Sequence, residues 1–473
     1  MKQITNPILP TNEYIPDPEP HVFGDRVYVY GSHDKFGGIS FCLNDYIVYS
    51  CPVDDLSDWS TKGISYRKAE DKEYKGGFVN VMYAPDCAKG KDGNYYLYYT
   101  LGFYGHIAVA KSDKPDGPFH FYGYVRYNDG VTLGDKKEYI QFDPAIFIDD
   151  DGKIYLYSGY GSVQRFGLKG KKNTDKGAMV FELEDDMLTI KNGPSYICKT
   201  IHNAKGTEFE GHEFFEASSM RKINGRYYFI YSSFANHELC YAISDHPDRD
   251  FSYGGVLISN CDGGLGEKKT NYYGNNHGSL LCLNGKYYIF YHRQTNKNSF
   301  ARQMCAEEIA FDGLHFKQAE MTSQGLNGKP LEGKGTYKAA ICCNLYSDLG
   351  AFFYKVLRRP APSHAYLTQE DKDNDDRESQ YIRNVTKHAI IGYKYFRFPE
   401  DVHSLSVTIK GRAKGTVYVK DGEKGTVLAA IPISPTSKKT AFKADFKPSK
   451  DVSALFFTFA GKGHFSFYDF TLE

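Results

Sequence analysis

The sequence predicts an all-β protein made of a five-bladed β-propeller followed by a β-sandwich. In the first two-thirds of the chain, a turn with Gly, Asp or Asn leads five times into a strand rich in Tyr, Val and Ile. This composition suits a pleated, half-buried strand, and no long segment has apolar residues at helical spacing. The five copies are GDRVYVYGS (24–32), DGNYYLYYT (92–100), DGKIYLYSG (151–159), NGRYYFIYS (224–232) and NGKYYIFYH (284–292).

The spacing of the copies predicts the blades. Each copy has a tyrosine at the same position, namely Tyr28, Tyr96, Tyr155, Tyr228 and Tyr288. Successive tyrosines lie 59 to 73 residues apart. A unit of this length holds about four short strands with their connections, which is one propeller blade. Five copies therefore predict five blades in residues 1–325.

The composition changes after the fifth copy. Residues 326–340 are rich in Gly and Lys and lack periodicity, which predicts a linker or a crossing loop. Strand patterns return in residues 341–473 without the repeated motif, for example SLSVTIKGR and ALFFTFAG. Strands of this length between Gly, Pro and Lys turns predict a jelly-roll-like β-sandwich.

Charge and composition exclude several classes of protein. Lys and Arg number 58, as do Asp and Glu, so no net field favours nucleic acid or an anionic membrane. No segment approaches the ~20 apolar residues that span a bilayer, and the first residues lack the apolar core of a signal peptide. The ten cysteines form no Cys-x-x-Cys pair, which is typical of free thiols in a reducing compartment. We therefore expect a cytoplasmic protein without a nucleic-acid or membrane partner.

A titratable residue precedes the shared tyrosine of every copy by 10 to 12 residues. The innermost strand of a propeller blade starts at the central channel, so equivalent positions meet at one mouth of that channel. Four carboxylates and one imidazole are therefore expected in a single cleft. They are Asp17, Asp86, Asp143, Glu216 and His277.

Carboxylates gathered in this way indicate cleavage of glycosidic bonds. One carboxylic acid protonates the leaving oxygen, and a second carboxylate activates water or attacks the anomeric carbon. A third carboxylate beside the proton donor raises the pKa of the donor and keeps it protonated near neutral pH. Glu216 lies just before a strand, whereas Glu213, three residues away, is expected on the opposite face of the extended segment.

The motifs around these residues resemble glycoside hydrolase family 43. They cover residues 5–320 in register with all five blades and are IPDP (15–18), YAPD (83–86), DPAIFIDDDGKIYLY (143–157), EASSMRKINGRYYFIYS (216–232) and NNHGS (275–279). The resemblance implies a five-bladed propeller that hydrolyses glycosides with inversion. It implies Asp17 as general base, Glu216 as general acid and Asp143 as the acid that positions Glu216 and raises its pKa. In an inverting enzyme the base and the acid stand about 6.5–9.5 Å apart, which leaves room for water.

The resemblance also implies residues that bind substrate. The family commonly has Trp-Ala-Pro-Asp where this chain has Tyr83, and a tyrosine ring still offers an apolar face to a sugar. Arg302 is implied as a substrate contact, and Asp86 as a hydrogen-bonded scaffold acid. His33 and Asp34 follow the first copy and are predicted to reach a sugar hydroxyl. A turn with an Asx hydrogen bond is the alternative for these two residues.

His277 is the residue through which a metal is implied. In the family the equivalent histidine lies near the channel axis and faces a bound calcium ion through water, or faces the substrate. Calcium prefers oxygen ligands, and a satisfied core histidine is the alternative. The chemistry itself requires no cofactor, so the expectation is of a structural calcium ion only.

The C-terminal region resembles family 6 carbohydrate-binding modules in residues 380–398 and 454–473. Such modules are β-sandwiches that often bind structural calcium. The domain is expected either to bind sugar or to pack on the propeller and shape the rim of the active site, and packing is favoured. Tyr393, Tyr395 and Phe396 fit a core as well as a sugar platform.

Together these observations predict an inverting glycoside hydrolase that releases terminal α-L-arabinofuranose from arabinoxylan-derived oligosaccharides. The same three acids serve a β-xylosidase acting on xylo-oligosaccharides, which is the alternative. A sugar-binding propeller without catalysis would not need all three acids.

Two other enzyme classes are disfavoured. A family 32 fructosidase would carry Asn-Asp-Pro-Asn, Arg-Asp-Pro and Glu-Cys motifs, whereas here Asp17 follows Ile-Pro and Glu216 precedes Ala. An endo-arabinanase would need an open cleft, whereas the additional sandwich domain favours a closed pocket.

Overall fold

The computed structural model describes residues 3–76, 80–102, 105–135, 139–162, 173–351, 364–370, 373 and 379–473. Within these residues the regular structure is β-strand and three short 3-10 helices, with no α-helix. The predicted all-β class is therefore confirmed. The 3-10 helices are η1 (Lys68–Glu70), η2 (Gly325–Asn327) and η3 (Ala339–Ile341).

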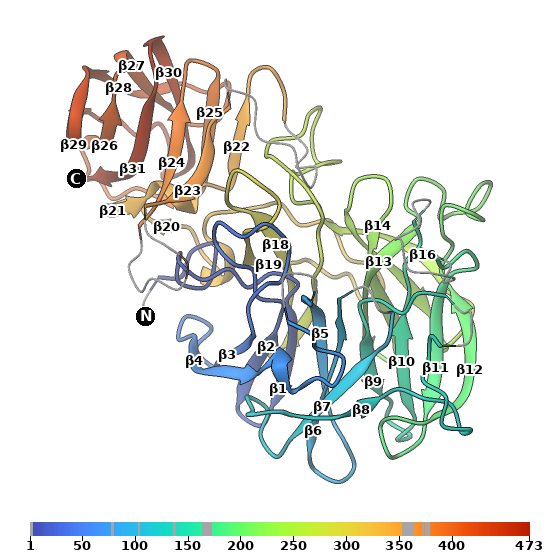
Figure 1. Cartoon of the computed structure of the whole chain (residues 1–473). Helices are drawn as coiled ribbons and strands as arrows, with labels where there is room; N and C mark the ends of the chain where they lie inside the picture. Colours follow the sequence, from blue (N-terminus) through green and yellow to red (C-terminus); the bar gives the residue numbers. More distant parts are fainter. Residues whose placement is uncertain are drawn as a thin grey trace.

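Five antiparallel sheets follow one another along the N-terminal part of the chain (Figure 1). The first two sheets consist of β1 (Glu19–Phe23), β2 (Arg26–Tyr30), β3 (Tyr46–Pro52) and β4 (Ser60–Tyr66), and of β5 (Met82–Lys89), β6 (Tyr95–Leu101), β7 (Ala108–Ser112) and β8 (His120–Tyr124). The third and fourth consist of β9 (Ala145–Ile148), β10 (Ile154–Ser158), β11 (Ala178–Leu183) and β12 (Ile190–Ile197), and of β13 (Phe214–Ile223), β14 (Arg226–Ser233), β15 (Leu239–Ser244) and β16 (Ser252–Ile258). The fifth consists of β17 (Ser279–Leu283), β18 (Lys286–Gln294) and β19 (Arg302–Glu308).

The innermost strands of these sheets form a closed ring. β1 contacts β5 and β17, β9 contacts β5 and β13, and β13 also contacts β17. A separate buried apolar cluster fills the space between each pair of neighbouring sheets. Between the first and the fifth sheet, for example, Val27 and Val29 share a cluster with Phe290 and Ala306. The five sheets are the blades of the predicted propeller.

The N-terminal segment fastens the two ends of the propeller together. The Ile8 N–H donates to the Met304 carbonyl of β19 at 3.1 Å. The Asn6 side chain accepts from the Ala306 N–H at 3.0 Å and donates to the Ala306 carbonyl at 3.1 Å. The fifth blade, which has three strands of its own, is thus extended by residues from the start of the chain, and this closes the ring.

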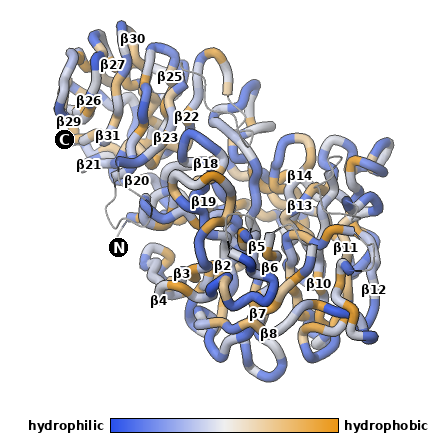
Figure 2. Tube along the Cα trace, in the orientation of Figure 1, coloured by the Kyte–Doolittle hydropathy of each residue, from blue (hydrophilic) through white to orange (hydrophobic). Residues whose placement is uncertain are grey.

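Two further sheets pack face to face as a sandwich (Figure 1). Figure 2 shows apolar residues concentrated along the strands of both domains, with hydrophilic residues mainly in the connections. One sheet contains β20 (Leu331–Glu332), β22 (Asn344–Ser347), β25 (Ala389–Arg397), β27 (Lys414–Lys420), β28 (Val427–Ile433) and β30 (Val452–Lys462). The other contains β21 (Gly335–Lys338), β23 (Tyr366–Gln369), β24 (Gln380–Val385), β26 (Ser404–Gly411), β29 (Thr436–Asp445) and β31 (Phe465–Leu472).

The segment predicted as a linker, residues 326–340, belongs to the sandwich instead. Its strand β20 pairs in parallel with β25, and its strand β21 pairs antiparallel with β31. Each sheet therefore gains one strand from this segment. Such short strands are held by backbone pairing to a neighbour, so the sequence shows no alternation that would reveal them.

The sandwich is fixed to the propeller through buried polar contacts. The Lys394 ammonium lies 2.8 Å from Glu320 and 3.3 Å from Asp262, and the Tyr395 hydroxyl donates to Glu320 at 2.8 Å. Farther along the interface, Arg293 of β18 donates to the Cys342 carbonyl at 2.8 Å. The interface thus uses Tyr395, one of the three candidates for a sugar platform.

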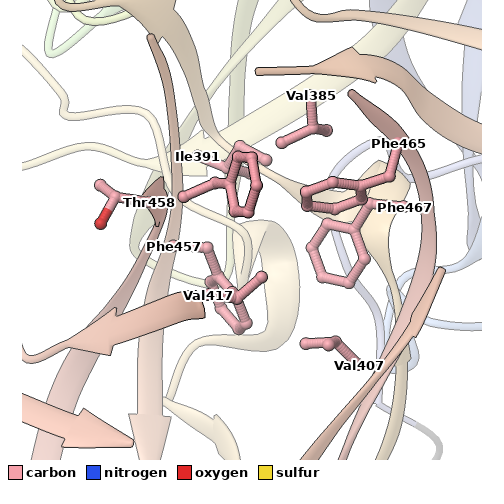
Figure 3. Close-up of a pocket in the computed structure, with 9 residues that line it drawn as sticks. Val385, Ile391, Val407, Val417, Phe457, Thr458, Phe465 and Phe467 are labelled. Carbon is pink, nitrogen blue, oxygen red and sulfur yellow. The ribbon is translucent and has the colours of Figure 1, made fainter. Parts of the chain in front are cut away.

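Tyr393 and Phe396, the other two platform candidates, lie in the core. Both are fully buried, and the Tyr393 hydroxyl donates to the Ala339 carbonyl. A small cavity of about 10 Å³ lies between the two sheets (Figure 3). Its walls are apolar apart from Thr458, and the space is roughly that of one water molecule. Neither feature offers a sugar site, so packing is the observed role of these residues.

We expect replacement of Lys394 with Met to lower the free energy of unfolding by about 3 kcal/mol. Its side chain is only 9% exposed, and that of Asp262 is 6% exposed. Removal of one partner from a buried ion pair leaves the other charge without compensation. Urea unfolding of the variant measures the loss, and Lys438→Met, at an exposed position, serves as the control. An equal midpoint for the two variants would show that the buried contact contributes nothing.

The cysteines are free thiols, as predicted. All ten are unpaired, and nine of them are buried, the exception being Cys282.

A search of the described residues for membrane-spanning helices finds none, because the helices present are short 3-10 turns.

Candidate active site

Asp17 lies at the start of the first blade against a buried arginine. Arg302 Nη1 donates to Asp17 Oδ1 at 2.9 Å, and His292 Nδ1 lies 3.1 Å from the same oxygen. Burial raises the pKa of Asp17, but the positive charge of Arg302 more than offsets this and holds the pKa far below its usual range. In the described residues these side-chain contacts fall on Oδ1, so Asp17 presents a carboxylate that is ionised near neutral pH and has Oδ2 available.

The backbone at two of the predicted acids is strained. Asp17 has φ +58° and Asp143 has φ +46°, in the left-handed region that costs a residue other than glycine roughly 1–3 kcal/mol. The conformation is held by contacts to the acids themselves. The Asp17 N–H donates to His292 Nδ1 at 3.2 Å, and Asp143 Oδ2 accepts from the Ala217 N–H at 3.0 Å. Strain of this kind persists where surrounding structure fixes the direction of a functional side chain.

Glu216 lies on β13, where the strand is irregular. The pairing of β13 with β14 shifts register between Phe214 and Glu216 and again before Ser219. Such bulges re-aim a side chain next to an active site. The Glu216 side chain is half-buried, and no hydrogen bond joins its carboxyl to any residue that the structure describes. Burial, followed by the negative charge of Asp17, raises its pKa to about 8.

Asp143 connects the acids to the imidazole of the fifth blade. Its Oδ2 lies 3.6 Å from His277 Nδ1, and it accepts the N–H of the residue after Glu216. Burial, then the charges of Glu216 and Asp17, raise the pKa of Asp143 well above its usual range. Burial lowers the pKa of His277 to about 4, so this imidazole is neutral near pH 7. The structure thus brings together Asp17, Asp143, Glu216 and His277.

Asp34 does not reach toward a sugar, in contrast to the prediction. It is fully buried, and its two oxygens accept from Nε and Nη2 of Arg302 at 2.9 and 3.0 Å. One oxygen also accepts the Cys42 N–H at 2.8 Å. The role of Asp34 is therefore to orient Arg302 against Asp17. Arg302 itself is predicted as a substrate contact, but its polar atoms face Asp17, Asp34 and Cys42.

His33 is also occupied by protein groups. It is 4% exposed, its Nδ1 bonds the Asp45 carbonyl at 2.8 Å, and its Nε2 faces Glu13 at 3.7 Å. Both ring nitrogens thus face protein groups, and the ring holds two chain segments together. This differs from the prediction, in which His33 contacts a sugar hydroxyl.

Tyr83 belongs to an aromatic cluster beside the acids. Its ring lies 5.0 Å from that of Phe142, and Phe41 packs at 4.8 Å over the guanidinium of Arg302. The cluster draws on four blades, and its aromatic members are Phe41, Tyr83, Phe142, Tyr160, Phe215 and Phe234. Two of them directly precede Asp143 and Glu216 in the sequence. Apolar ring faces next to carboxyl groups suit the binding of a sugar ring.

Asp86 takes the scaffold role that the resemblance implies. One of its oxygens lies 2.6 Å from His21 Nε2 and also accepts the Cys87 N–H, and the other accepts the Ile146 N–H at 2.7 Å. These contacts join the first three blades. Asp86 is therefore fully engaged in structural hydrogen bonds.

The residues around His277 do not form a calcium cage. Calcium takes six to eight oxygen ligands, and in the part of the chain that the structure describes the one carboxylate within 4 Å of the His277 ring nitrogens is that of Asp143. Among the described residues two groups of His, Cys, Asp and Glu are close enough to share an ion, and neither includes His277. A calcium ion at this position would have to be held through water.

The sequence and the fold match a known family. The model of glycosyl hydrolases family 43 matches residues 4–314, which span all five blades. The chain belongs to this family. It is therefore a glycoside hydrolase.

Relatives and solved structures agree with this assignment. The chain is 46% identical to a xylosidase/arabinosidase of Thermoclostridium stercorarium. This match covers the full length of the chain and 99% of the length of the relative. A family 43 β-xylosidase/α-arabinofuranosidase from a compost microbial metagenome, solved with xylotriose in a calcium-free form, is 27% identical with a TM-score of 0.53. That match covers 67% of this chain and 98% of the other. A family 43 arabinoxylan arabinofuranohydrolase from Bacillus subtilis, 20% identical, shares the fold over 99% of this chain and 97% of its own, with a TM-score of 0.51.

Two features of this family 43 site lie beyond the sequence prediction. His292 contacts Asp17, and it ends the fifth copy at a position where the other copies have Ser32, Thr100, Gly159 and Ser232. His292 is the only titratable residue at this position in the five copies, and this difference could have identified it as a site residue. The bidentate contact between Asp34 and Arg302 joins residues 268 positions apart, and no spacing in the sequence reveals it.

Proposed function

We propose that this family 43 enzyme releases terminal α-L-arabinofuranose from arabinoxylan-derived oligosaccharides in one inverting step. Asp17 acts as general base, Glu216 as general acid, and Asp143 positions Glu216 and raises its pKa. The observation that carries this proposal is the opposite electrostatic environment of two carboxyl groups in one site. Arg302 keeps Asp17 ionised, while burial keeps a proton on Glu216.

The proposed step uses the free atoms of both acids. Asp17 Oδ2 takes a proton from a water molecule as the water attacks the anomeric carbon, and Glu216 gives its proton to the leaving oxygen. Asp17 becomes neutral as Glu216 becomes ionised, so the net charge of the site does not change. Arg302 contributes by fixing the Asp17 carboxylate, and the aromatic cluster provides the surface for the sugar.

A β-D-xylosidase activity is the second candidate. It is supported by the names of the relatives, which combine xylosidase with arabinosidase or arabinofuranosidase. The same acids serve both sugars because the reaction at the anomeric carbon is the same. The shape of the pocket decides between them.

Hydrolysis of 4-nitrophenyl α-L-arabinofuranoside and of 4-nitrophenyl β-D-xylopyranoside tests this function. A higher kcat/KM for the arabinoside, lost in Asp17→Asn, is the expected result. A higher value for the xyloside would select the second candidate with the mechanism unchanged. Absence of cleavage of both compounds and of arabinoxylo-oligosaccharides would contradict the proposal.

We expect a bell-shaped dependence of kcat/KM on pH. The base must be ionised, and because the pKa of Asp17 is depressed, the acidic limb should lie below the usual range of an aspartate. The acid must be protonated, so activity should fall as the pH rises through about 8, the pKa of Glu216. The carboxyl groups of Asp143 and Glu216 repel each other when both are ionised, so the two acids titrate as a pair. Asp143→Asn removes this repulsion, so the alkaline limb should move to lower pH. An alkaline limb that stays in place in Asp143→Asn would contradict the proposed role of Asp143.

The reaction needs no cofactor, and the implied calcium ion is a separate proposal. An ion held through water near His277 would have a structural effect. Treatment of the enzyme with EGTA should then lower its melting temperature, and added calcium should restore it. An unchanged melting temperature would contradict a calcium site.

A further inference from the structure

A second cluster of metal-binding side chains lies on the fourth blade, outside the site described above. It consists of His212, just before β13, Glu238, just before β15, and Cys240 on β15. In each of the three, one ligand atom lies within 4.8 Å of those of the other two. Glu238 is 8% exposed, and its Oε2 is a buried oxygen without a hydrogen-bond partner.

The other such group in the described residues makes a useful comparison. Glu19, His21 and Asp86 are equally close, but their atoms are already engaged. Arg221 and Ser219 donate to Glu19, and both oxygens of Asp86 accept hydrogen bonds. That group is satisfied by protein alone. The fourth-blade cluster, in contrast, contains an unpaired carboxylate oxygen that faces an imidazole and a thiol.

The distances fit a tetrahedral transition metal. His212 Nδ1 lies 3.4 Å from Glu238 Oε2 and 3.9 Å from Cys240 Sγ. The usual lengths of Zn–N, Zn–O and Zn–S bonds place neighbouring ligand atoms of a tetrahedron roughly 3.3–3.6 Å apart. Small rotations of the side chains therefore suffice to enclose an ion.

We propose that His212, Glu238 and Cys240 form a binding site for Zn²⁺, with a fourth position open to water. The donor set, one nitrogen, one oxygen and one sulfur, is typical of zinc and unsuited to calcium or magnesium, which prefer oxygen. The His212 side chain is 34% exposed, which provides a path from solvent to the ligand atoms.

The surrounding residues hold the three ligands in place. The His212 ring stacks on Tyr253 with the ring centres 4.7 Å apart, and its carbonyl accepts from the Tyr231 hydroxyl. The backbone of Glu238 is held by Ser233, which accepts its N–H at 3.1 Å and donates to its carbonyl at 2.9 Å. Contacts of this kind orient ligands and strengthen metal binding.

Metal binding must release a proton at this site. Burial raises the pKa of the Cys240 thiol well above its usual range, and Tyr253 and Ser233 are its hydrogen-bond neighbours. Zinc binds the thiolate, so the thiol proton leaves to solvent as the Zn–S bond forms. The affinity should therefore rise with pH.

An ion at this position would join two segments that flank the active site. His212 precedes Glu216 by four residues, and the turn before Glu238 carries Phe234 of the aromatic cluster. The Phe234 N–H already donates to the Glu213 carbonyl at 2.9 Å. Zinc would add a second link between the same segments, so its binding should raise the melting temperature.

Titration of the metal-free full chain with Co²⁺ tests the proposal without recourse to activity. Cobalt replaces zinc in such sites and gives a near-ultraviolet charge-transfer band when bound to a thiolate. We expect this band to saturate at one Co²⁺ per chain, and Zn²⁺ to abolish it by displacement. Absence of a saturable band would overturn the proposal.

Matched variants assign the band to these residues. Cys240→Ser should abolish it, whereas Cys282→Ser, which changes the exposed thiol, should leave it unchanged. His212→Gln and Glu238→Gln should weaken binding by more than the ~10–100-fold typical for loss of an outer-shell partner. His212 is half-exposed, so its replacement is a safeguard if Cys240→Ser does not fold. A band that persists in Cys240→Ser, or a Co²⁺ affinity that is unchanged in His212→Gln, would contradict the site.

Discussion

Replacement of Glu216 with Gln should lower kcat on oligosaccharides by about 10²–10⁴-fold, the contribution typical of a positioned general acid. Glutamine keeps the shape of the side chain but has no acidic proton to give to the leaving oxygen. The loss should be smaller on 4-nitrophenyl glycosides, because nitrophenolate leaves without full protonation. The difference between the two substrate types therefore reports the role of Glu216 as an acid, and KM should change little.

The matched control for this variant is Glu213→Gln. Glu213 is buried nearby on the same segment, but its carboxylate accepts from the Gly211 N–H, a contact that an amide oxygen can keep. Its activity should remain close to that of the parent. Equal losses in both variants, or an equal loss on both substrate types, would show that Glu216 is not the acid.

Replacement of Arg302 with Met should affect stability and catalysis together. Arg302 is 2% exposed and contacts both Asp17 and Asp34, so its removal leaves two buried carboxylates without a counter-charge. Loss of one partner of a buried ion pair costs about 3–5 kcal/mol. The pKa of Asp17 should rise at the same time, because burial would no longer be opposed by the guanidinium. The acidic limb of the pH profile should therefore move to higher pH.

Urea unfolding and the pH dependence of kcat/KM measure these two effects. Arg412→Met removes an exposed arginine and should leave both quantities close to those of the parent. Arg302→Lys keeps the charge but cannot form the forked contact with Asp34, so it should lie between the parent and Arg302→Met. An unchanged acidic limb in Arg302→Met would contradict the claim that Arg302 keeps Asp17 ionised.

The repeat made the propeller predictable, because it marks one strand and one turn in each blade. The position of the acids relative to the shared tyrosine also predicted which residues meet at the channel, as the contact between Asp143 and His277 and the effect of the Asp17 charge on the pKa of Glu216 show. The catalytic roles given to Asp17, Asp143 and Glu216 stay predictions until variants are measured. The cytoplasmic location also stays a prediction.

What the sequence could not provide was the pairing of buried side chains. Asp34 follows the end of a strand, where the sequence predicts an exposed turn, yet its carboxylate is fully buried against Arg302. Similarly, β20 and β21 lie in a Gly- and Lys-rich segment and are strands only because β25 and β31 offer free edges. Both features depend on partners that lie far away in the sequence.

The stereochemistry of the first product tests the central claim most directly. A base that activates water on the face opposite the leaving group must invert the anomeric configuration. Proton NMR of the sugar released from the better 4-nitrophenyl substrate, recorded before mutarotation, should show the β-anomer of L-arabinofuranose or the α-anomer of D-xylose. Release of a sugar with the configuration of the substrate would contradict the account, because it would make one of the acids a nucleophile.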